Sequence, residues 1–343
     1  MPVRVTTSSL VLLAALLALA IYALARGQIA LPFLEAIKAL FGAESEGLSG
    51  QIVREIRLPR VLAAVLAGSA LGVGGVLMQA LFRNPVADGW SLGLLAGGQL
   101  GVALTVTAAA FAGPAAVSFL TLFAGPSITL AAAAGVALAA AAMLALGRRL
   151  SAITLLVVGL MMGFTAQGLT SVLLHFAARA GGRVYGGWSD ASFAGVQPES
   201  LPWLAVPIVA GMVLAVATAK PLSSLLLGEN YAQSLGVRVG ALRRLALTAT
   251  VMLVAPVVAF CGPVSFIGLI VPHLARALAG SARILPLLPI AALGGALLAL
   301  AGDAIVHAPW EQHFLHLNAI LAIVGAPAVI LLLVFSPALR GWR

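Results

Sequence analysis

The segment LAAAAGVALAAAAMLAL, Leu130–Leu146, decides the class of this protein because it contains no polar or charged side chain. A helix that crosses a bilayer needs about 20 predominantly apolar residues, whereas a membrane β-barrel shows short segments of alternating polarity. The rest of the chain has a similar composition: its 343 residues are 62% hydrophobic and 8% charged, and the mean hydropathy is +1.12. We therefore predict an all-α polytopic membrane protein.

Apolar runs between polar, proline or glycine breaks predict ten membrane-spanning helices. Their approximate ranges are 8–26, 58–82, 90–112, 115–146, 152–176, 201–219, 241–261, 264–279, 285–306 and 318–337. The fourth is longer than one span needs and contains Gly125-Pro126, which predicts a kinked or re-entrant start. Met1–Arg26 has some features of a signal peptide, but its long apolar run favours a retained first span. We expect a single transmembrane domain over residues 1–343.

The distribution of basic residues predicts the orientation of the chain. With the N-terminus in the cytoplasm, the inner segments carry a large excess of basic side chains, and the outer segments carry equal numbers of both signs. This satisfies the positive-inside rule and places both termini and the polar stretch Leu225–Leu245 in the cytoplasm. The segment REIRLPR, Arg54–Arg60, departs from the rule at the outer mouth of the second span. Its arginines either snorkel at the interface or form a docking site for an acidic partner from outside.

Polar side chains inside spans are candidates for function, because burying them in hydrocarbon is costly. The largest group lies in the fifth span, at spacings that partly share one face: Thr165, Gln167, Thr170, Ser171 and His175. We predict that this group lines a substrate path. Glycine pairs one helical turn apart, Gly68 with Gly72 and Gly97 with Gly101, predict close packing between helices instead.

The sequence lacks the motifs of an enzyme or of a transporter with its own ATPase. It has no Gly-x-x-x-x-Gly-Lys loop for nucleotide, no HExxH and no CxxC. His307, His313 and His316 gather near a predicted outer loop, where solvated side chains are favoured over a metal or haem contact, so no metal site is predicted. Scattered single bases argue against a nucleic-acid partner. Asp303 is the lone carboxylate within a span, whereas a proton-coupled carrier is expected to bury more carboxylates. We therefore expect the energy for transport to come from another protein. An ion-coupled secondary transporter is the alternative, and an intramembrane enzyme is disfavoured because paired catalytic groups are missing.

Three motifs in order resemble the FecCD-type permeases, the membrane subunits of ABC importers for iron–siderophores, haem and cobalamin. They are RLPRVLAAVLAGSALGVGGVLMQALFRNPVAD (Arg57–Asp88), LGENYAQSLGVRV (Leu227–Val239) and GPVSFIGLIVPHLARALAG (Gly262–Gly280). The resemblance covers about Arg57 to Leu333. It implies a multi-pass permease of the bacterial cytoplasmic (inner) membrane that works as a homodimer, with two ATPase subunits that bind ATP and Mg, and with one substrate-binding protein. The chain itself is then expected to bind no cofactor and to have no ATPase site.

The resemblance also implies roles for particular residues. Arg57 and Arg60 of the RLPR motif would meet acidic residues of the binding protein, with His307 in place of the family's third arginine. The sequence Asn84-Pro85-Val86, which we call the gate loop, would form the cytoplasmic gate. The fifth and tenth spans would line the translocation path.

The cytoplasmic segment at about 220–240 resembles the family's contact with the ATPase, and we call Leu222–Gly236 the coupling segment. The residues expected to contact the ATPase are Leu225, Leu227, Gly228, Glu229, Ala232, Leu235 and Gly236. Gly228 and Gly236 suit turns at the two ends of a short helix.

The resemblance does not fix the substrate. An iron chelate, siderophore or haem, is the first expectation, and cobalamin is the alternative. The sequence departs from the family pattern after Asp88 and in the outer loop from Glu311 to Asn318, where the binding protein and the path entrance would meet.

Overall fold

The computed structural model describes residues 2–27, 31–41, 48–147, 149–177, 179–308 and 315–335, and within these ranges all regular structure is helical. Each of the ten expected spans coincides with a helix. They are α1 (Pro2–Ala25), α4 (Leu58–Phe82), α5 (Leu94–Ala112), α7 (Ala124–Leu146), α8 (Ala152–Phe176), α10 (Leu201–Leu225), α12 (Val239–Cys261), α13 (Ile267–Ala279), α14 (Ile284–Val306) and α15 (Leu317–Phe335). All except α13 and α15 meet the length and hydropathy of a membrane span over their described residues. The predicted all-α membrane fold is confirmed.

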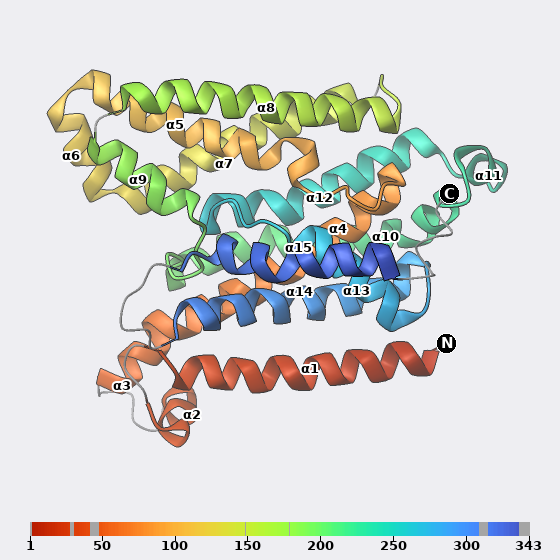
Figure 1. Ribbon diagram of the computed structural model, residues 1–343, viewed down its shortest axis with the longest axis horizontal. Coiled ribbons are helices and arrows are strands. Elements are labelled where there is room, and N and C mark those ends of the chain that lie inside the picture. The colour runs from red at the N-terminus through yellow and green to blue at the C-terminus, as the bar shows by residue number, and fades with distance from the viewer. Residues whose placement is uncertain are drawn as a thin grey trace.

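The shorter helices lie at the two ends of the bundle. The start of α1, the end of α15 and helix α11 (Glu229–Ser234) lie at one end, while α2 (Phe33–Phe41), α3 (Leu48–Gln51), α6 (Pro114–Leu122) and α9 (Arg179–Ser189) lie at the other (Figure 1). Following the charge distribution, we call the end with α11 the cytoplasmic end and the opposite end the outer end. Three short η segments complete the described chain: η1 (Ile52–Arg57), a π-helix that continues into α4, and the 3₁₀ turns η2 (Trp90–Leu92) and η3 (Pro198–Ser200).

The fourth expected span is broken in the structure, as its length predicted. The break falls at Phe123, between α6 and α7, and not at Gly125-Pro126. Pro126 lies in the first turn of α7, where backbone N–H groups have no partner within the helix, so its missing N–H costs nothing. Helix α9 was not expected from the sequence, since its glycine-rich residues read as an outer loop.

Helix α4 is the centre of the bundle, and glycines set its packing. Gly68 lies against the backbone of Gly295 in α14, and Gly75 lies against the backbone of Gly268 in α13, so closely that a methyl group at either position would overlap it. Gly101 of α5 lies in the same way against α7. Close approach of backbones through small residues is the usual route to stable contacts between membrane helices, and the predicted role of these glycines is confirmed.

The order in which the helices pack has an internal symmetry. Helix α4 lies against α14 and α12 lies against α7, while α5 pairs with α7 and α13 pairs with α14. Numbered as spans, the second contacts the ninth, and the seventh contacts the fourth. These two contacts correspond when spans 2–5 are matched with spans 7–10. This is the arrangement expected of two inverted repeats, spans 2–5 and spans 7–10.

Candidate functional site

The coupling segment is a helix–turn–helix at the cytoplasmic end. Gly228, with φ of 120°, starts α11, and Gly236, with φ of 81°, follows its last turn. Both values lie in the region that favours glycine, so the turns predicted at these two positions are confirmed. Ala232 is fully buried, whereas Leu227 and Leu235 are 69% and 59% exposed. The segment therefore anchors itself through one alanine and leaves two large apolar side chains at the surface.

Arg243 of α12, which the sequence did not single out, holds the coupling segment in place. Its guanidinium donates to Glu229 Oε1 at 3.2 Å and to the carbonyl oxygen of Leu150 at 2.6 Å. Leu150 lies directly before α8, so one arginine joins α12, α11 and the start of α8.

The gate loop follows α4, whose last residue, Phe82, precedes Arg83 in the left-handed conformation with φ of 47°. The Asn84 Oδ1 atom accepts a hydrogen bond from the Val86 N–H at 3.0 Å, an Asx turn that shapes the loop. The Val86 side chain is 51% exposed.

A polar network fixes this loop to α13. His273 Nε2 lies 2.9 Å from the Pro85 carbonyl oxygen. Arg276 Nη2 donates to Gln79 Oε1 at 2.7 Å, and Gln79 Nε2 donates to the Leu269 carbonyl oxygen at 3.2 Å. The sequence contained a signal for this network, because PHLAR places a histidine and an arginine inside a short apolar helix.

The gate loop lies between two hollows. Asn84 and Pro85 line a groove of about 730 Å³ at the cytoplasmic end, together with Leu225, Leu227 and Glu229 of the coupling segment. The groove thus brings together the two groups of residues that the resemblance assigned to the gate and to the ATPase contact.

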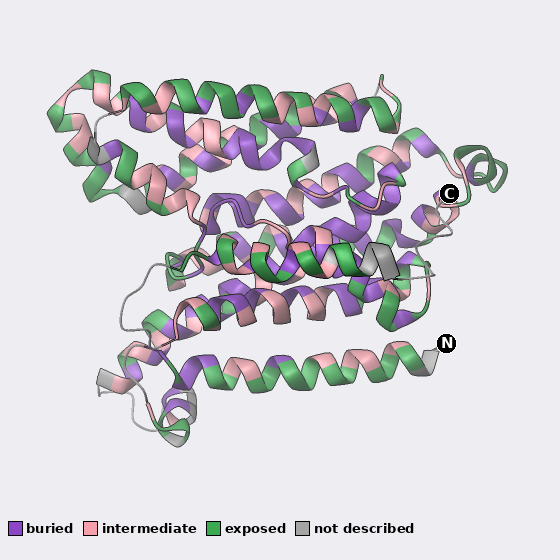
Figure 2. Ribbon diagram, in the orientation of Figure 1, coloured by how far each residue is buried: buried purple, intermediate pink, exposed green. Residues whose placement is uncertain are grey.

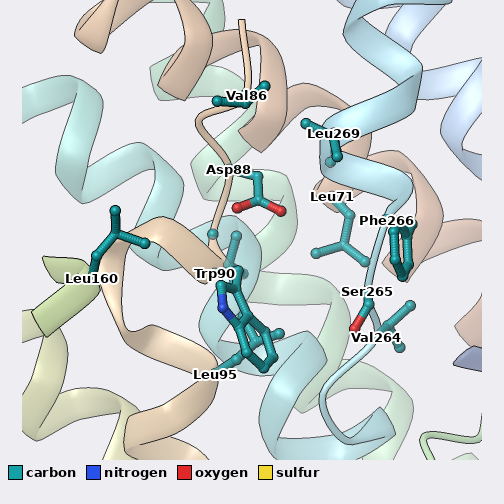
Figure 3. Close-up of a pocket in the computed structure, with 13 residues that line it drawn as sticks. Leu71, Val86, Asp88, Trp90, Leu95, Leu160, Val264, Ser265, Phe266 and Leu269 are labelled. Atoms are coloured by element: carbon teal, nitrogen blue, oxygen red, sulfur yellow. The ribbon is translucent and has the colours of Figure 1, made fainter. Parts of the chain in front are cut away.

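The second hollow is a cavity of about 460 Å³ on the other side of the gate loop, lined in part by Val86. Asp88 and Trp90 line this cavity between Leu160 on one side and Phe266 and Leu269 on the other (Figure 3). Phe266 has φ of 67°, an unusual value for a bulky residue, and it directly precedes α13.

The outer end of α4 carries a buried charge cluster. Arg57 and Arg60 are 4% and 6% exposed. Arg57 Nη1 donates to the Leu24 carbonyl oxygen at 2.7 Å, and Arg60 Nε lies 3.1 Å from Asp303 Oδ2. His307 Nδ1 lies 3.2 Å from the other carboxylate oxygen of Asp303. The arginines expected to meet an external partner therefore face into this chain, and their role in docking stays a prediction.

The polar residues of the fifth span divide into two groups on α8. Thr170 is buried inside the bundle. The other four side chains are exposed: Thr165, Gln167, Ser171 and His175. Figure 2 shows α8 exposed along most of its length, in contrast to the buried helices at the centre. The hydroxyls of Thr165 and Ser171 donate to carbonyl oxygens of their own helix, those of Met161 and Gln167.

The three outer histidines do not come together as one group in the described residues. His316 Nδ1 lies 3.3 Å from Asp190 Oδ2, His307 belongs to the Asp303 cluster, and His313 lies outside the described residues. The described residues contain no group of three metal-ligating side chains. No metal role is assigned to them.

A glycine-packed bundle of apolar helices with a gate loop between two hollows defines a membrane transport subunit. The chain belongs to the FecCD transport family, whose model matches residues 15–335. It is 33% identical to the vitamin B12 import system permease protein BtuC of Salmonella typhimurium strain LT2 over 285 residues, 83% of this chain and 84% of the relative. The BtuC protein of Salmonella typhi matches equally well.

Two solved structures have a similar fold. One is an inward-facing conformation of a putative metal-chelate type ABC transporter, with a TM-score of 0.80 and 24% identity, covering 95% of this chain and 98% of that one. The other is PsaBC from Streptococcus pneumoniae in complex with Fab, with a TM-score of 0.53 and 14% identity, covering 89% and 97%. The chain is thus a multi-pass membrane permease of a bacterial ABC importer, and it is not the ATPase of that importer.

Proposed function

We propose that this permease imports a corrinoid of the cobalamin class. The supporting observation is the 33% identity to vitamin B12 permeases over 83% of the chain. An iron chelate, which the sequence resemblance put first, becomes the competing substrate. Both are large metal chelates, so the choice between them depends on the outer loop and the path and not on the fold.

Uptake into proteoliposomes tests the substrate. The permease is reconstituted with its ATPase and its binding protein, and radiolabelled cyanocobalamin, a ferric siderophore and haem are compared with and without ATP. We expect ATP-dependent uptake of the corrinoid alone. Uptake of only an iron chelate contradicts the proposed substrate, and uptake driven by an ion gradient without the ATPase contradicts the importer mechanism.

The second part of the proposal is that two copies of the chain form the path between them, with α8 and α15 at the interface. The exposed Gln167 supports this, because an amide group facing lipid would be costly, whereas the hydroxyls of Thr165 and Ser171 are bonded within α8. Exposed Ile323 and Val324 of α15 would lie on the same interface.

Disulfide cross-linking tests the dimer. The single cysteine, Cys261, is buried, so Gln167→Cys introduces the only exposed thiol. We expect oxidation in membranes to give a covalent dimer. A matched control is Leu17→Cys, which is 56% exposed and belongs to α1, on the opposite side of the bundle from α8 (Figure 1). Equal cross-linking at both positions, or none at Gln167, contradicts the interface.

The third part is that Leu227 and Leu235 of the coupling segment enter the ATPase subunit. Two exposed apolar side chains at a water-facing turn are typical of a protein contact, and the groove beside them reaches the gate loop. We expect Leu235→Asp to abolish co-purification of the ATPase, while Gln233→Asp, at an exposed polar side chain of the same coupling segment, leaves it intact. Retained ATPase in the Leu235→Asp variant contradicts this contact.

Arg57, Arg60 and His307 stay our proposed contacts with the binding protein. The geometry makes these contacts unequally accessible. An acidic residue of the partner has to compete with Asp303 for Arg60, whereas the half-buried His307 side chain, 28% exposed, is directly reachable. We expect His307→Glu to weaken binding of the loaded binding protein at least tenfold. Unchanged affinity removes His307 from the docking surface.

A further inference from the structure

Helix α13 is held at its start and at its middle by hydrogen bonds to distant parts of the chain. Ahead of its first turn, Asn318 of α15 makes two hydrogen bonds to the preceding loop. Its Oδ1 accepts from the Ser265 N–H and its Nδ2 donates to the Pro263 carbonyl oxygen, both at 3.0 Å. Phe266, between this loop and the helix, holds a backbone conformation that costs about 1 kcal/mol or more and persists only where the surroundings impose it. The start of α13 is therefore tied to α15.

The middle of α13 contacts the gate loop through His273. His273 is 2% exposed, and its Nε2 atom contacts the Pro85 carbonyl oxygen. Because a carbonyl oxygen can only accept, Nε2 carries the proton and His273 is the donor. The bond joins residues 188 positions apart in the sequence and connects the gate-loop backbone to another helix.

Two other polar contacts lie near this bond. The gate loop follows α4 and lies beside α13. These two helices are in contact, and the hydrogen bond from Arg276 to Gln79 joins them. The Asx turn of Asn84 shapes the loop internally but does not attach it to another helix. Loss of the His273 donor therefore leaves Pro85 O without its anchor, while the α4–α13 contact through Gly75 and Gly268 stays in place.

We propose that His273 is a positioning residue that ties the gate loop to α13, so that the loop moves with this helix and does not open independently of it. This inference deepens the proposed function and rests on the gate loop being the cytoplasmic gate. A permease with an untied loop would let solutes leak when no ATP is hydrolysed, and it would hydrolyse ATP with less uptake for each turnover.

Two variants and a control separate positioning from stability. His273→Leu removes the donor, and His273→Gln keeps an N–H donor at similar reach. The control is Thr250→Val in α12, which removes an equally buried hydroxyl whose bond goes only to Ala246 of its own helix. We expect His273→Leu and Thr250→Val to lower the thermal midpoint by similar amounts.

The readouts are distance and leak. Spin labels at Val86→Cys and Leu227→Cys report the gate loop against the coupling segment within one chain; both sites are exposed and the native cysteine is buried. We expect His273→Leu to broaden this distance distribution and to raise ATP-independent leak of a small fluorescent dye at least fivefold. His273→Gln should restore both, and Thr250→Val should change neither.

A distance distribution and leak in His273→Leu equal to those of the parent chain would overturn the proposal, as would equal changes in the Thr250→Val control. Neither readout requires the transported substrate, and the distance readout does not require a second copy of the chain. Failure of corrinoid uptake therefore tests the proposed function separately from the role of His273.

Discussion

Helices α4 and α8 have the same length of 25 residues and similar apolar composition, yet their surroundings are opposite. Twenty residues of α4 are buried, against five of α8. The glycines show the difference. Gly68, Gly72 and Gly75 of α4 lie against neighbouring backbones, whereas α8 approaches another backbone near Gly163 and a side chain at Gly168 would meet open space. Hydropathy alone identifies a span, but contact with small residues decides whether that span is the core of the bundle or an outer surface.

The largest effect should come from the glycine contacts. We expect Gly68→Val to destabilise the protein by more than about 4 kcal/mol, enough to prevent folding, because the new side chain overlaps the backbone of Gly295. The matched variant Gly168→Val in α8 should change stability by less than about 0.5 kcal/mol. Yield of monodisperse protein and thermal unfolding in detergent measure both. A folded, stable Gly68→Val protein would break the comparison.

A buried charge at the outer end of α4 should give the next largest effect. Asp303→Asn leaves Arg60 without its carboxylate partner inside the bundle, and orphaning a buried charge costs about 3 kcal/mol or more. The exposed pair of Asp190 with His316 is the control, since Asp190→Asn removes a carboxylate at 46% exposure and should cost less than about 1 kcal/mol. Equal thermal shifts for the two variants would mean that the Arg60 pair is solvated.

Large-to-small substitutions compare the two helices directly. Met78→Ala in α4 creates a cavity at a fully buried position and should cost about 2 to 3 kcal/mol. Met161→Ala in α8, where the side chain is 53% exposed, should leave unfolding of the single chain unchanged within about 0.5 kcal/mol. Met161→Ala could instead lower the stability of the assembled protein and not of the separated chain. That result would show that α8 is buried by a second copy, whereas α4 is buried within its own chain.

The smallest effect is expected at the cytoplasmic surface. Glu229→Gln removes the ion pair with Arg243, and Glu229 is 45% exposed, so the loss should be below about 1 kcal/mol and should vanish at high salt. Thermal unfolding at low and high ionic strength measures it. A salt-independent loss above 1 kcal/mol would mean that the contact of α11 with α12 is buried.

The sequence by itself determined the membrane class, the ten helices and their order, because about 20 apolar residues in a row can satisfy their backbone in lipid only as a helix. It also predicted the turns at Gly228 and Gly236 and close helix packing at Gly68 and Gly72 of α4, but not the partners of these glycines. The family resemblance was confirmed over residues 15–335. It placed an iron chelate ahead of cobalamin, whereas the identity to vitamin B12 permeases favours the reverse.

Only the tertiary structure decided where the charged and polar side chains face. It put Arg57 and Arg60 inside the bundle, paired Arg60 with Asp303, and brought His273 to Pro85 across 188 residues. These contacts depend on the relative rotation and depth of helices that are far apart in the chain. Hydropathy reports whether a side chain prefers lipid or water and contains no information about its partner, so pairing inside a membrane bundle follows from packing alone.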